Sequence, residues 1–532
     1  MKYIFITGGV VSGLGKGIVG SSIAAILKSF GVKVYMKKFD PYLNIDPGTM
    51  NPIEHGEVFV TDDGAETDLD LGHYERFIDV NLSKNASISS GKIYEHTLLM
   101  ERRGQFYGKT VQIVPHITNL IKEEIYTLDA DVDVDVVICE IGGTAGDIES
   151  QPFIEAIRQV RMEKGIKSVM FIHVALLPFL KITNEYKTKP IQHSFKQLLG
   201  LGIQPDIIVT RSETEIEKKL KEKISLFCNI NEESVISCPD SESIYFVPQT
   251  LYNEKIHEII TSQLEIKITK PNFSWWEKLI KNIKEATNNV KITIVAKYFA
   301  LKDSYLSVIE SLKIAGFATK NNISIEWVDA KKLNIDNYKQ ELKNSKGILV
   351  PGGFGESGIE GKILAAKYAR ENNIPYLGIC LGLQVACVEF ARNVLKLSNA
   401  ASTEVDINTK NPVIDIMNGK DKYNIGGTLR VGGFNTNIKK GTLAYNIYKK
   451  NVIRERHRHR YEFNNDYREA FESKGFVFSG IYEEGNLVEI IENPACNFFI
   501  ASQYHPEFTS RIGKPNPLFK SFVSAVVKYS YK

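Results

Sequence analysis

Cys380 and His505 are the side chains of this chain that best suit nucleophilic chemistry. Cys380 lies at the centre of Gly378-Ile379-Cys380-Leu381-Gly382, and His505 is followed by Pro506 and Glu507. A cysteine attacks as its thiolate, which needs a base, and the base needs an orienting carboxylate. The sequence therefore predicts a catalytic triad of Cys380, His505 and Glu507.

The segments around these residues predict how they are positioned. An apolar run, 374–379, leads into Cys380, and a helix-like stretch, 383–395, follows it. Strand, sharp turn and helix around G-x-C-x-G describe a nucleophile elbow, whose helix N-terminus stabilises the thiolate. A second apolar run, 497–502, places His505 and Glu507 at a strand end, from which they can face the thiol.

The alternative for Cys380 is a buried core cysteine, but the motif context argues against it. The glycine-rich segment 351–355 offers backbone N–H groups for an oxyanion hole. Residues 350–384 and 503–507 closely resemble the class I glutamine amidotransferase family. That family hydrolyses glutamine through a Cys–His–Glu triad and passes ammonia to a partner active site.

Composition limits the remaining possibilities. The chain has 532 residues, more than one core normally covers, and 66 Lys+Arg against 63 Asp+Glu give a net charge of +3. This near-neutral balance does not indicate nucleic acid or an acidic membrane as a partner. The cysteines include no C-x-x-C pair, which indicates a reducing compartment and no zinc site. With neither a signal peptide nor an apolar run of about 20 residues, we expect a soluble, cytoplasmic protein.

The order of apolar runs predicts an α/β fold in two domains. Continuous rather than alternating runs are typical of strands in a parallel sheet, and they are found at 2–7, 33–38, 135–140, 169–174, 206–210 and 291–295. The polar stretch 263–290 reads as a linker with one helix. We therefore expect a P-loop-like parallel-sheet domain at 1–265, a linker at 266–290 and an α/β glutaminase domain at 291–532.

A glycine-rich loop, 7–17, follows the first strand and opens a helix. Backbone N–H groups at such a turn bind phosphate, and Lys16 adds a positive charge. The loop is not a standard P-loop, because Gly17 stands where a Ser or Thr would bind magnesium. Asp70 and Glu140 are the carboxylates predicted to hold Mg²⁺ instead, although either one alone is more simply read as a solvated surface acid.

An ATP-type loop joined to a glutaminase resembles the CTP synthase family, and the resemblance runs from Thr7 to Phe522. The segments that carry it are 8–17, 40–50, 55–60, 64–77, 140–151, 187–190 and 455–462. The family is a ligase of pyrimidine nucleotide biosynthesis that converts UTP, ATP and glutamine to CTP, ADP, phosphate and glutamate. ATP phosphorylates uracil O4, and ammonia then displaces the phosphate.

The resemblance also implies nucleotide-binding residues in the N-terminal half. For ATP these are Gly13, Leu14, Gly15, Lys16, Gly17, Ile18, Lys38, Asp70, Pro239, Asp240 and Ser241. For UTP, and for CTP as feedback inhibitor, they are Ser12, Lys187, Thr188, Lys189, Gln192 and Lys223. Asp147, Ile148 and Glu149 are implied to form a separate pocket for the cytosine ring. Without the family, 187–189 is only a polar loop.

In the C-terminal half the resemblance implies that glutamine is bound by Gly353, Leu381, Gly382, Leu383, Gln384, Glu404 and Arg460. Segment 355–361 is similar to a lid that GTP, the allosteric activator, stabilises. Pro52, His55 and Val58 match the lining of an ammonia passage. The family forms homotetramers and filaments. Segment 408–424 reads as a loop.

Two other interpretations remain open at the level of sequence. Another ATP-dependent amidotransferase, such as a cobyrinate amidase, shares the deviant loop, although segment 187–192 argues against it. An assembly protein without activity is disfavoured because all the candidate catalytic and metal-binding residues are present. The run 454–460, Arg-Glu-Arg-His-Arg-His-Arg, could in isolation form a nucleic-acid patch or a histidine metal site, but the charge balance and the intervening arginines argue against both.

Overall fold

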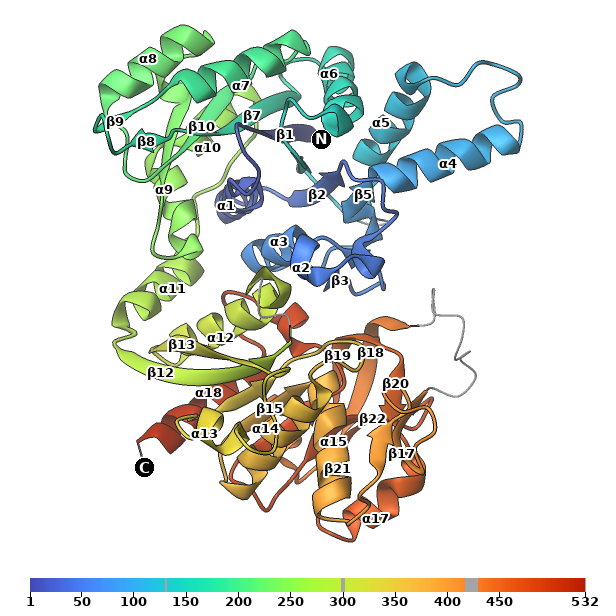
Figure 1. Ribbon diagram of the computed structural model, residues 1–532. Coiled ribbons are helices and arrows are strands. Elements are labelled where there is room, and N and C mark those ends of the chain that lie inside the picture. Colours follow the sequence, from blue (N-terminus) through green and yellow to red (C-terminus); the bar gives the residue numbers. More distant parts are fainter. Residues whose placement is uncertain (130–131, 298–301, 417–428, 532) are drawn as a thin grey trace. The chain divides into compact units, whose positions relative to one another are not determined.

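The computed structural model describes residues 1–129, 132–297, 302–416 and 429–531. It divides into two compact units, one of residues 1–49 and 70–275, the other of residues 50–69 and 276–532. Each unit is built around its own sheet (Figure 1). The second unit therefore includes a 20-residue segment from the N-terminal part of the sequence, which is called the inserted segment (50–69) below.

The first unit has a seven-stranded sheet in the order β11-β10-β7-β1-β6-β2-β5, and all its strand pairs are parallel. Its strands are β1 (Lys2–Gly9), β2 (Val34–Asp40), β5 (Ser87–Ser89), β6 (Val136–Ile141), β7 (Val169–Leu176), β10 (Ile207–Ser212) and β11 (Val235–Pro239), with a separate hairpin of β8 (Phe179–Leu180) and β9 (Glu185–Tyr186). The predicted parallel sheet is confirmed, and each of the five strands predicted in this unit is found with both ends within two residues of the expected bounds.

Helices of the first unit pack on both faces of this sheet. Phe5, Phe39 and Val137 point to one face and share a core with α5 and α6. On the other face Gly20 of α1 lies so close to Ile6 that a Cβ there would be 2.9 Å from its Cδ1. The helices are α1 (Lys16–Ser29), α3 (Asp70–Ile78), α4 (Ser90–Arg102), α5 (Thr118–Tyr126), α6 (Gln151–Lys164), α7 (Lys189–Gly200), α8 (Lys218–Cys228), α9 (Val247–Asn253) and α10 (Ile256–Gln263).

The second unit has a nine-stranded mixed sheet in the order β13-β12-β14-β15-β23-β22-β21-β18-β19. The pairs from β13 to β23 are parallel, and those from β23 to β19 are antiparallel. The strands are β12 (Asn288–Ala296), β13 (Asn321–Asp329), β14 (Ile348–Val350), β15 (Tyr376–Ile379), β18 (Arg430–Ile438), β19 (Val452–His459), β21 (Val477–Tyr482), β22 (Leu487–Glu492) and β23 (Phe499–Ser502).

Smaller elements complete the second unit. A three-stranded sheet contains β16 (Ala400–Ser402), β17 (Asn411–Ile416) and β20 (Tyr461–Phe463), and the inserted segment contributes α2 (Pro52–His55), β3 (Phe59–Val60) and β4 (Glu66–Thr67). The helices are α12 (Leu306–Ala318), α13 (Tyr338–Leu342), α14 (Ile359–Glu371), α15 (Leu381–Asn393), α16 (Leu443–Tyr448), α17 (Arg468–Glu472) and α18 (Pro517–Ser530).

Two sequence expectations can be compared with these elements directly. The predicted linker helix is present as α11 (Ser274–Glu285), with Trp276 buried. The expectation of a loop at 408–424 is wrong for 411–416, because these residues form β17, where Ile414 pairs with Phe463. Residues 408–410 lie outside helices and strands as expected, and 417–424 lie outside the described residues. Within the described part of the chain, no helix has the length and apolar character needed to cross a membrane.

Candidate functional site

Cys380 lies in a sharp turn between β15 and α15. Its backbone has φ 52° and ψ −101°, a conformation that a side-chain-bearing residue rarely adopts. A Cβ at Gly378 would lie 2.7 Å from the backbone of Gly382, and a Cβ at Gly382 would lie 2.2 Å from the carbonyl oxygen of Val350. Both glycines are thus required for the turn to close, and the predicted arrangement of strand, sharp turn and helix around Cys380 is confirmed.

His505 and Glu507 follow β23, the strand beside β15. His505 Nδ1 lies 2.7 Å from Glu507 Oε1. The backbone N–H of His505 donates to the carbonyl oxygen of Arg456 at 2.8 Å. A Cβ at Gly352 would be 2.9 Å from His505 Cε1 and 3.6 Å from Cys380 Cβ, so the thiol-bearing residue and the imidazole border the same glycine. The structure thus brings the three predicted triad residues together.

The charge environment of His505 favours its protonated form. Burial opposes a charge on the imidazole, but Glu507 and Cys380 outweigh burial and raise the pKa of His505 to about 10. An imidazolium beside the sulfur stabilises a thiolate, the form in which cysteine attacks a carbonyl carbon.

Gln503, which is not among the predicted site residues, also contacts the thiol. Its Nε2 lies 3.6 Å from Cys380 Sγ, and its Oε1 lies 3.4 Å from Gln384 Nε2, which also donates to the Tyr461 carbonyl at 3.0 Å. Gln503 is fully buried. Its position two residues before His505 was the available signal, since a residue at that spacing in an extended segment can point to the same side.

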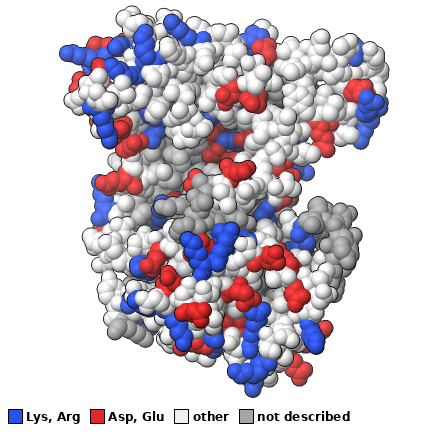
Figure 2. Space-filling view, in the orientation of Figure 1, with Lys and Arg blue, Asp and Glu red and all other residues white. Residues whose placement is uncertain are grey.

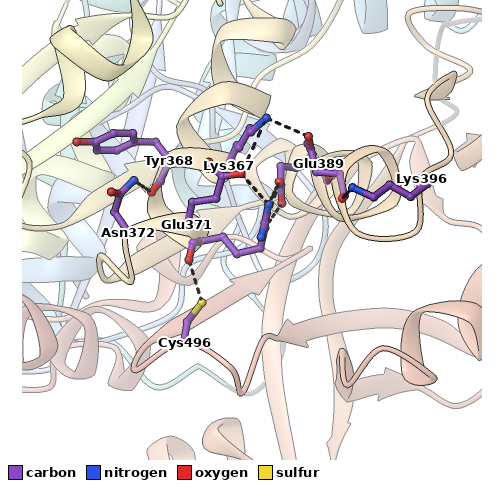
Figure 3. Close-up of polar contacts among 9 residues, drawn as sticks. Lys367, Tyr368, Glu371, Asn372, Glu389, Lys396 and Cys496 are labelled. Atoms are coloured by element: carbon purple, nitrogen blue, oxygen red, sulfur yellow. Dashed lines mark hydrogen bonds and ion pairs between the residues drawn. The ribbon is translucent and has the colours of Figure 1, made fainter.

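Helix α15, which begins directly after Cys380, is held against α14 by a two-pronged ion pair. Arg370 Nη2 and Nε donate to Glu389 at 2.7 and 2.9 Å. Figure 3 shows the surrounding contacts, including Lys367 on α14 and the Cys496 thiol, which donates to the Arg370 carbonyl at 3.7 Å. Burial raises the pKa of Glu389, while Arg370 opposes this rise. The pair fixes α14 relative to the helix that follows Cys380.

Most predicted glutamine-binding residues lie around the same turn. Glu404 Oε1 accepts a hydrogen bond from the Gly355 N–H at 2.7 Å. Arg460 is close enough to Glu404 for its positive charge to favour the ionised carboxylate. Leu381, Gln384 and Glu404 line a small cavity of about 20 Å³ beside α15. Burial raises the pKa of Glu404, and Gly355, Lys297 and Arg460 oppose that rise. An adjacent acid and guanidinium suit the ammonium and carboxylate of an amino acid.

A second cavity, of about 80 Å³, reaches the triad from the side of the inserted segment. Pro52 and Val58 line it together with His505, Glu507 and residues 351–354. His55, predicted to belong with Pro52 and Val58, is not part of this lining, and its Nε2 lies 3.3 Å from Asp68.

Strand β19 explains the run of alternating arginines and histidines. Arg454, Arg456 and Arg458 point to the inserted segment, where they contact Asp62, the Val60 carbonyl and Glu66 respectively. The alternate residues point inward, and His457 Nδ1 lies 3.0 Å from His459 Nε2. The period of two of a β-strand therefore divides the run into one face that contacts the inserted segment and one on which the two histidines lie together.

In the first unit, the predicted phosphate-binding loop (7–17) lies next to both predicted metal-binding carboxylates. A Cβ at Gly17 would be 2.5 Å from Asp70 Oδ1 and 3.1 Å from Glu140 Oε2. Lys38 forms ion pairs with both carboxylates, and its Nζ lies 3.0 Å from Glu140 Oε1. The hydroxyl of Tyr74 also donates to Glu140. The carboxylates occupy the space that a Ser or Thr side chain at position 17 would need. This arrangement fits Mg²⁺, which prefers carboxylate and phosphate oxygens.

Of the three predicted adenine-side residues, Ser241 shares a cavity of about 160 Å³ with the predicted phosphate-binding loop, whereas Pro239 and Asp240 are not in its lining. Gly13, Gly15 and Ile18 line it together with Ser241. Arg211, which the sequence analysis missed, also lines it and forms an ion pair with Asp240 at 2.9 Å. Pro239 ends the neighbouring strand β11. Arg211 lies near the carboxyl end of β10, where ligands bind in parallel sheets, and this position was the available signal.

The predicted UTP and CTP residues form two groups. Lys187 is paired with Glu185, whose pKa is lowered first by Lys187 and also by Lys223, and Gln192 donates to Thr188 at 3.0 Å. Lys189 Nζ lies 6.0 Å from the ring centroid of Phe227. The other group is the turn at 147–149, where Asp147 accepts from the N–H and hydroxyl of Thr144 at 2.7 and 2.8 Å. Within the described residues, no hydrogen bond or ion pair joins the two groups or connects either with Ser12.

Acidic and basic side chains both occur across the visible surface of each unit (Figure 2). The lysines of α8, which include Lys218, Lys219, Lys221 and Lys223, are accompanied by Glu217 and Glu222. The surface shown in Figure 2 therefore presents mixed charge on both units.

Comparisons with known proteins assign both halves of the sequence. The family model described as CTP synthase N-terminus matches residues 2–266, and that described as glutamine amidotransferase class-I matches residues 300–525. A CTP synthase of Mesoplasma florum is 60% identical over 99% of both chains, and one of Staphylococcus aureus (strain NCTC 8325 / PS 47) is 54% identical over 99% of both. A solved structure of a Trypanosoma brucei CTPS glutaminase domain with bound acivicin aligns with 38% identity and a TM-score of 0.43, covering 45% of this chain and 94% of that one.

Proposed function

This chain belongs to the CTP synthase family, and we propose how its two units divide the reaction. It is a glutamine-dependent ligase that converts UTP to CTP in pyrimidine nucleotide biosynthesis. The second unit releases ammonia from glutamine at Cys380, and the first unit activates UTP with ATP. The observation that carries this proposal is the Cys380 elbow beside the paired His505 and Glu507.

Glutamine hydrolysis begins when the Cys380 thiolate attacks the side-chain amide carbon. His505, held by Glu507 at 2.7 Å, donates its proton to the leaving ammonia and then takes one from the water that cleaves the thioester. Arg460 binds the α-carboxylate of glutamine and Glu404 its α-ammonium group. Gly353, Leu381, Gly382, Leu383 and Gln384 complete the glutamine site.

Ammonia leaves through the cavity lined by Pro52 and Val58, with His55 close by on α2. His505 lines this cavity, so ammonia released beside His505 enters it directly. It does not have to leave past the residues that bind glutamine.

The first unit phosphorylates uracil O4 and so converts a poor leaving group to a good one. Gly13, Leu14, Gly15, Lys16, Gly17 and Ile18 hold the ATP phosphates, with Lys38 as a second cation, and Pro239, Asp240 and Ser241 lie at the adenine. Asp70 and Glu140 would hold Mg²⁺, which when bound would supply positive charge to offset that of the phosphate groups. Burial lowers the pKa of Lys16, although Glu140 and Asp70 oppose this, and Lys16 donates to the Gly143 carbonyl at 2.7 Å.

UTP is held by Ser12, Lys187, Thr188, Lys189, Gln192 and Lys223. CTP acts as a feedback inhibitor that shares this triphosphate site and places its base at Asp147, Ile148 and Glu149. GTP activates glutamine hydrolysis through the lid at 355–361, where Gly355 and Gly358 have positive φ angles of 74° and 78°. The chain forms a homotetramer that can extend into filaments.

The proposed domains are 1–265 for the synthetase, 266–290 for the linker and 291–532 for the glutaminase, with the inserted segment packing in the second compact unit. All six cysteines are unpaired, which supports a reducing, cytoplasmic location.

The test is CTP formation from UTP and ATP with either glutamine or ammonia as nitrogen donor. We expect the wild type to use both, and Cys380→Ala to lose glutamine-dependent synthesis while keeping ammonia-dependent synthesis. Loss of both activities in a folded Cys380→Ala protein would contradict the two-site proposal, and retention of both would remove Cys380 from its catalytic role.

A further inference from the structure

Lys362 is a fully buried lysine beside the catalytic turn that the mechanism above does not use. It lies in the first turn of α14, and its side chain is completely enclosed. Its Nζ donates to the carbonyl oxygens of Pro351, at 3.0 Å, and Gly352, at 3.5 Å. Within the residues that the structure describes, these carbonyls are its hydrogen-bond partners, and no carboxylate pairs with it.

An ammonium group without a carboxylate partner is costly to bury, so an apolar side chain would fill the same space at a lower cost in folding free energy. Burial and, to a smaller extent, the charge of Lys297 lower the pKa of Lys362 to about 7, while Cys380 opposes the shift. Its two acceptors both belong to the glycine-rich loop beside the thiol. The cost of burying this ammonium group therefore indicates that Lys362 acts on that loop and is not there only to fill space in the core.

The geometry of the peptide bond shows what that role is. In a trans peptide the C=O and N–H groups point in opposite directions. With the carbonyls of Pro351 and Gly352 turned to Lys362, the N–H groups of Gly352 and Gly353 are turned to the opposite side of the loop. Neither N–H has an acceptor among the described residues of the chain.

These N–H groups belong to the part of the loop that borders the reacting groups. A Cβ at Gly352 would point at His505 Cε1, 2.9 Å away, and at Cys380 Cβ, 3.6 Å away, and a Cβ at Gly353 would lie 3.6 Å from the Leu381 side chain. Gly353 has φ +157°, and a glycine-rich loop can rotate its peptide planes at little steric cost. Something outside the loop must therefore select one orientation of these peptide groups.

We propose that Lys362 is a positioning residue that fixes the peptide groups of Pro351–Gly353 so that their N–H groups form the oxyanion hole for glutamine hydrolysis at Cys380. Helix α14 can serve as the support because its other end is anchored to α15 by the pair of Arg370 and Glu389 (Figure 3). The hydrogen bonds of Lys362 fix the glycine-rich segment 351–355 to α14, and the pair of Arg370 and Glu389 fixes α14 to α15. Together they fix the position of that segment relative to Cys380. This inference rests on the proposed role of Cys380.

The test compares Lys362→Met, which keeps the length and loses the donor, with Lys37→Met. Lys37 is an equally buried lysine of the first unit that also donates to two backbone carbonyls, those of Glu124 and Thr127. Glutamate release, ammonia-dependent CTP formation and inhibition by the aldehyde analogue of glutamine are measured. The aldehyde forms a thiohemiacetal whose oxyanion occupies the hole, whereas alkylation of Cys380 by iodoacetamide forms no oxyanion.

For Lys362→Met we expect kcat for glutamine hydrolysis to fall on the order of 10²-fold, the effect of losing an oxyanion donor, with KM changed less than about threefold. Affinity for the aldehyde should fall by a similar factor, while the alkylation rate and ammonia-dependent synthesis stay within about twofold. Lys37→Met should leave kcat for glutamine hydrolysis and the aldehyde affinity unchanged. An unchanged kcat in folded Lys362→Met, or equal losses of aldehyde affinity and alkylation rate, would overturn the proposal.

A second measurement needs no variant. In a crystal structure of the wild type with the aldehyde adduct, we expect Lys362 on the carbonyls of Pro351 and Gly352 and an N–H of the loop on the oxyanion. A loop carbonyl turned toward the adduct would overturn the proposal even if Lys362→Met does not fold. Failure of the underlying role of Cys380 would be seen separately, as glutamine hydrolysis that survives Cys380→Ala.

Discussion

Arg458 Nε donates a hydrogen bond to Glu66 Oε1 at 2.6 Å. The guanidinium group of this arginine also lies 4.8 Å from the ring centroid of Phe354, which is part of the glycine-rich segment 351–355. Glu66 belongs to the inserted segment, whose two ends continue into the first unit at Thr49 and Asp70. One arginine of β19 thus contacts both the loop beside Cys380 and a segment that is continuous with a proposed magnesium-binding residue.

We predict that Arg458→Met lowers kcat for glutamine hydrolysis by about tenfold. This is the rate effect expected when a cation–π contact and a charge-assisted hydrogen bond that hold the loop are both lost. Arg454→Met is the matched control, because Arg454 is on the same side of β19 and pairs with Asp62 of the same segment, but its side chain is 51% exposed. The measurement is glutamate release by both variants. Equal effects of the two substitutions would show that the contact with Phe354 has no separate importance.

A second prediction concerns magnesium. Asp70→Asn and Glu140→Gln should each reduce CTP formation from glutamine and from ammonia on the order of 10²-fold, the scale of lost charge stabilisation in a preorganised site. Both carboxylates border Gly17, where no hydroxyl is present to replace them. Rates are measured across a Mg²⁺ titration, with glutamate release as the control that should survive. A near-normal ammonia-dependent rate would remove the substituted residue from metal binding.

Local features of the sequence were sufficient to predict the sheet of the first unit and the elbow. Continuous apolar runs identified β1, β6 and β7, because both faces of a parallel sheet are buried. The glycines at 378 and 382 identified the turn, because each lacks room for a Cβ.

The position of the inserted segment could not be predicted in this way. It depends on contacts such as Arg454 with Asp62, which are 392 residues apart in the sequence. The sequence shows that arginines alternate with other residues in 454–460. It does not show which residues each side of this strand contacts. Gln503 and Arg211 were missed for a related reason, since their importance comes from side chains that other strands bring near them.

The charge on His505 gives a prediction about pH. Its pKa of about 10 lies above the ordinary value of 6.5, so between these two values the folded protein retains a proton that the unfolded chain releases. This contribution to stability is complete below pH 6.5 and is lost as the pH rises toward 10, with a total of roughly 5 kcal/mol.

Glu507→Gln removes the largest of the effects that raise this pKa, so its stability should fall less between pH 7 and pH 10 than that of the wild type. The measurement is the thermal unfolding midpoint of both proteins over this range. Glu507→Gln should also lower glutamine hydrolysis on the order of 10²- to 10⁴-fold, as loss of a triad carboxylate does. Parallel pH profiles of the two proteins would contradict the assignment of Glu507 as the partner that charges His505.

The last prediction separates the binding of UTP from inhibition by CTP. The two nucleotides share ribose and triphosphate and differ at C4, where a carbonyl acceptor replaces an amine donor. A site that acts on O4 is therefore poorly suited to the amine, whereas one triphosphate site can serve both. Asp147 already accepts two hydrogen bonds from Thr144, and the exposed Glu149 has no hydrogen bond or ion pair among the described residues, so Glu149 is the better test of an acceptor for the cytosine amine.

Glu149→Ala should weaken CTP inhibition and leave the half-saturating UTP concentration nearly unchanged. Lys187→Ala should weaken both by similar factors, because it removes a phosphate contact that the two nucleotides share. Glu185→Gln serves as the control for Lys187, since it removes the ion-pair partner of that lysine and keeps the ammonium group. The inhibition constant for CTP and the half-saturating UTP concentration are measured for all three variants. If Glu149→Ala raises the UTP requirement as much as it relieves inhibition, the base of CTP does not occupy a separate pocket.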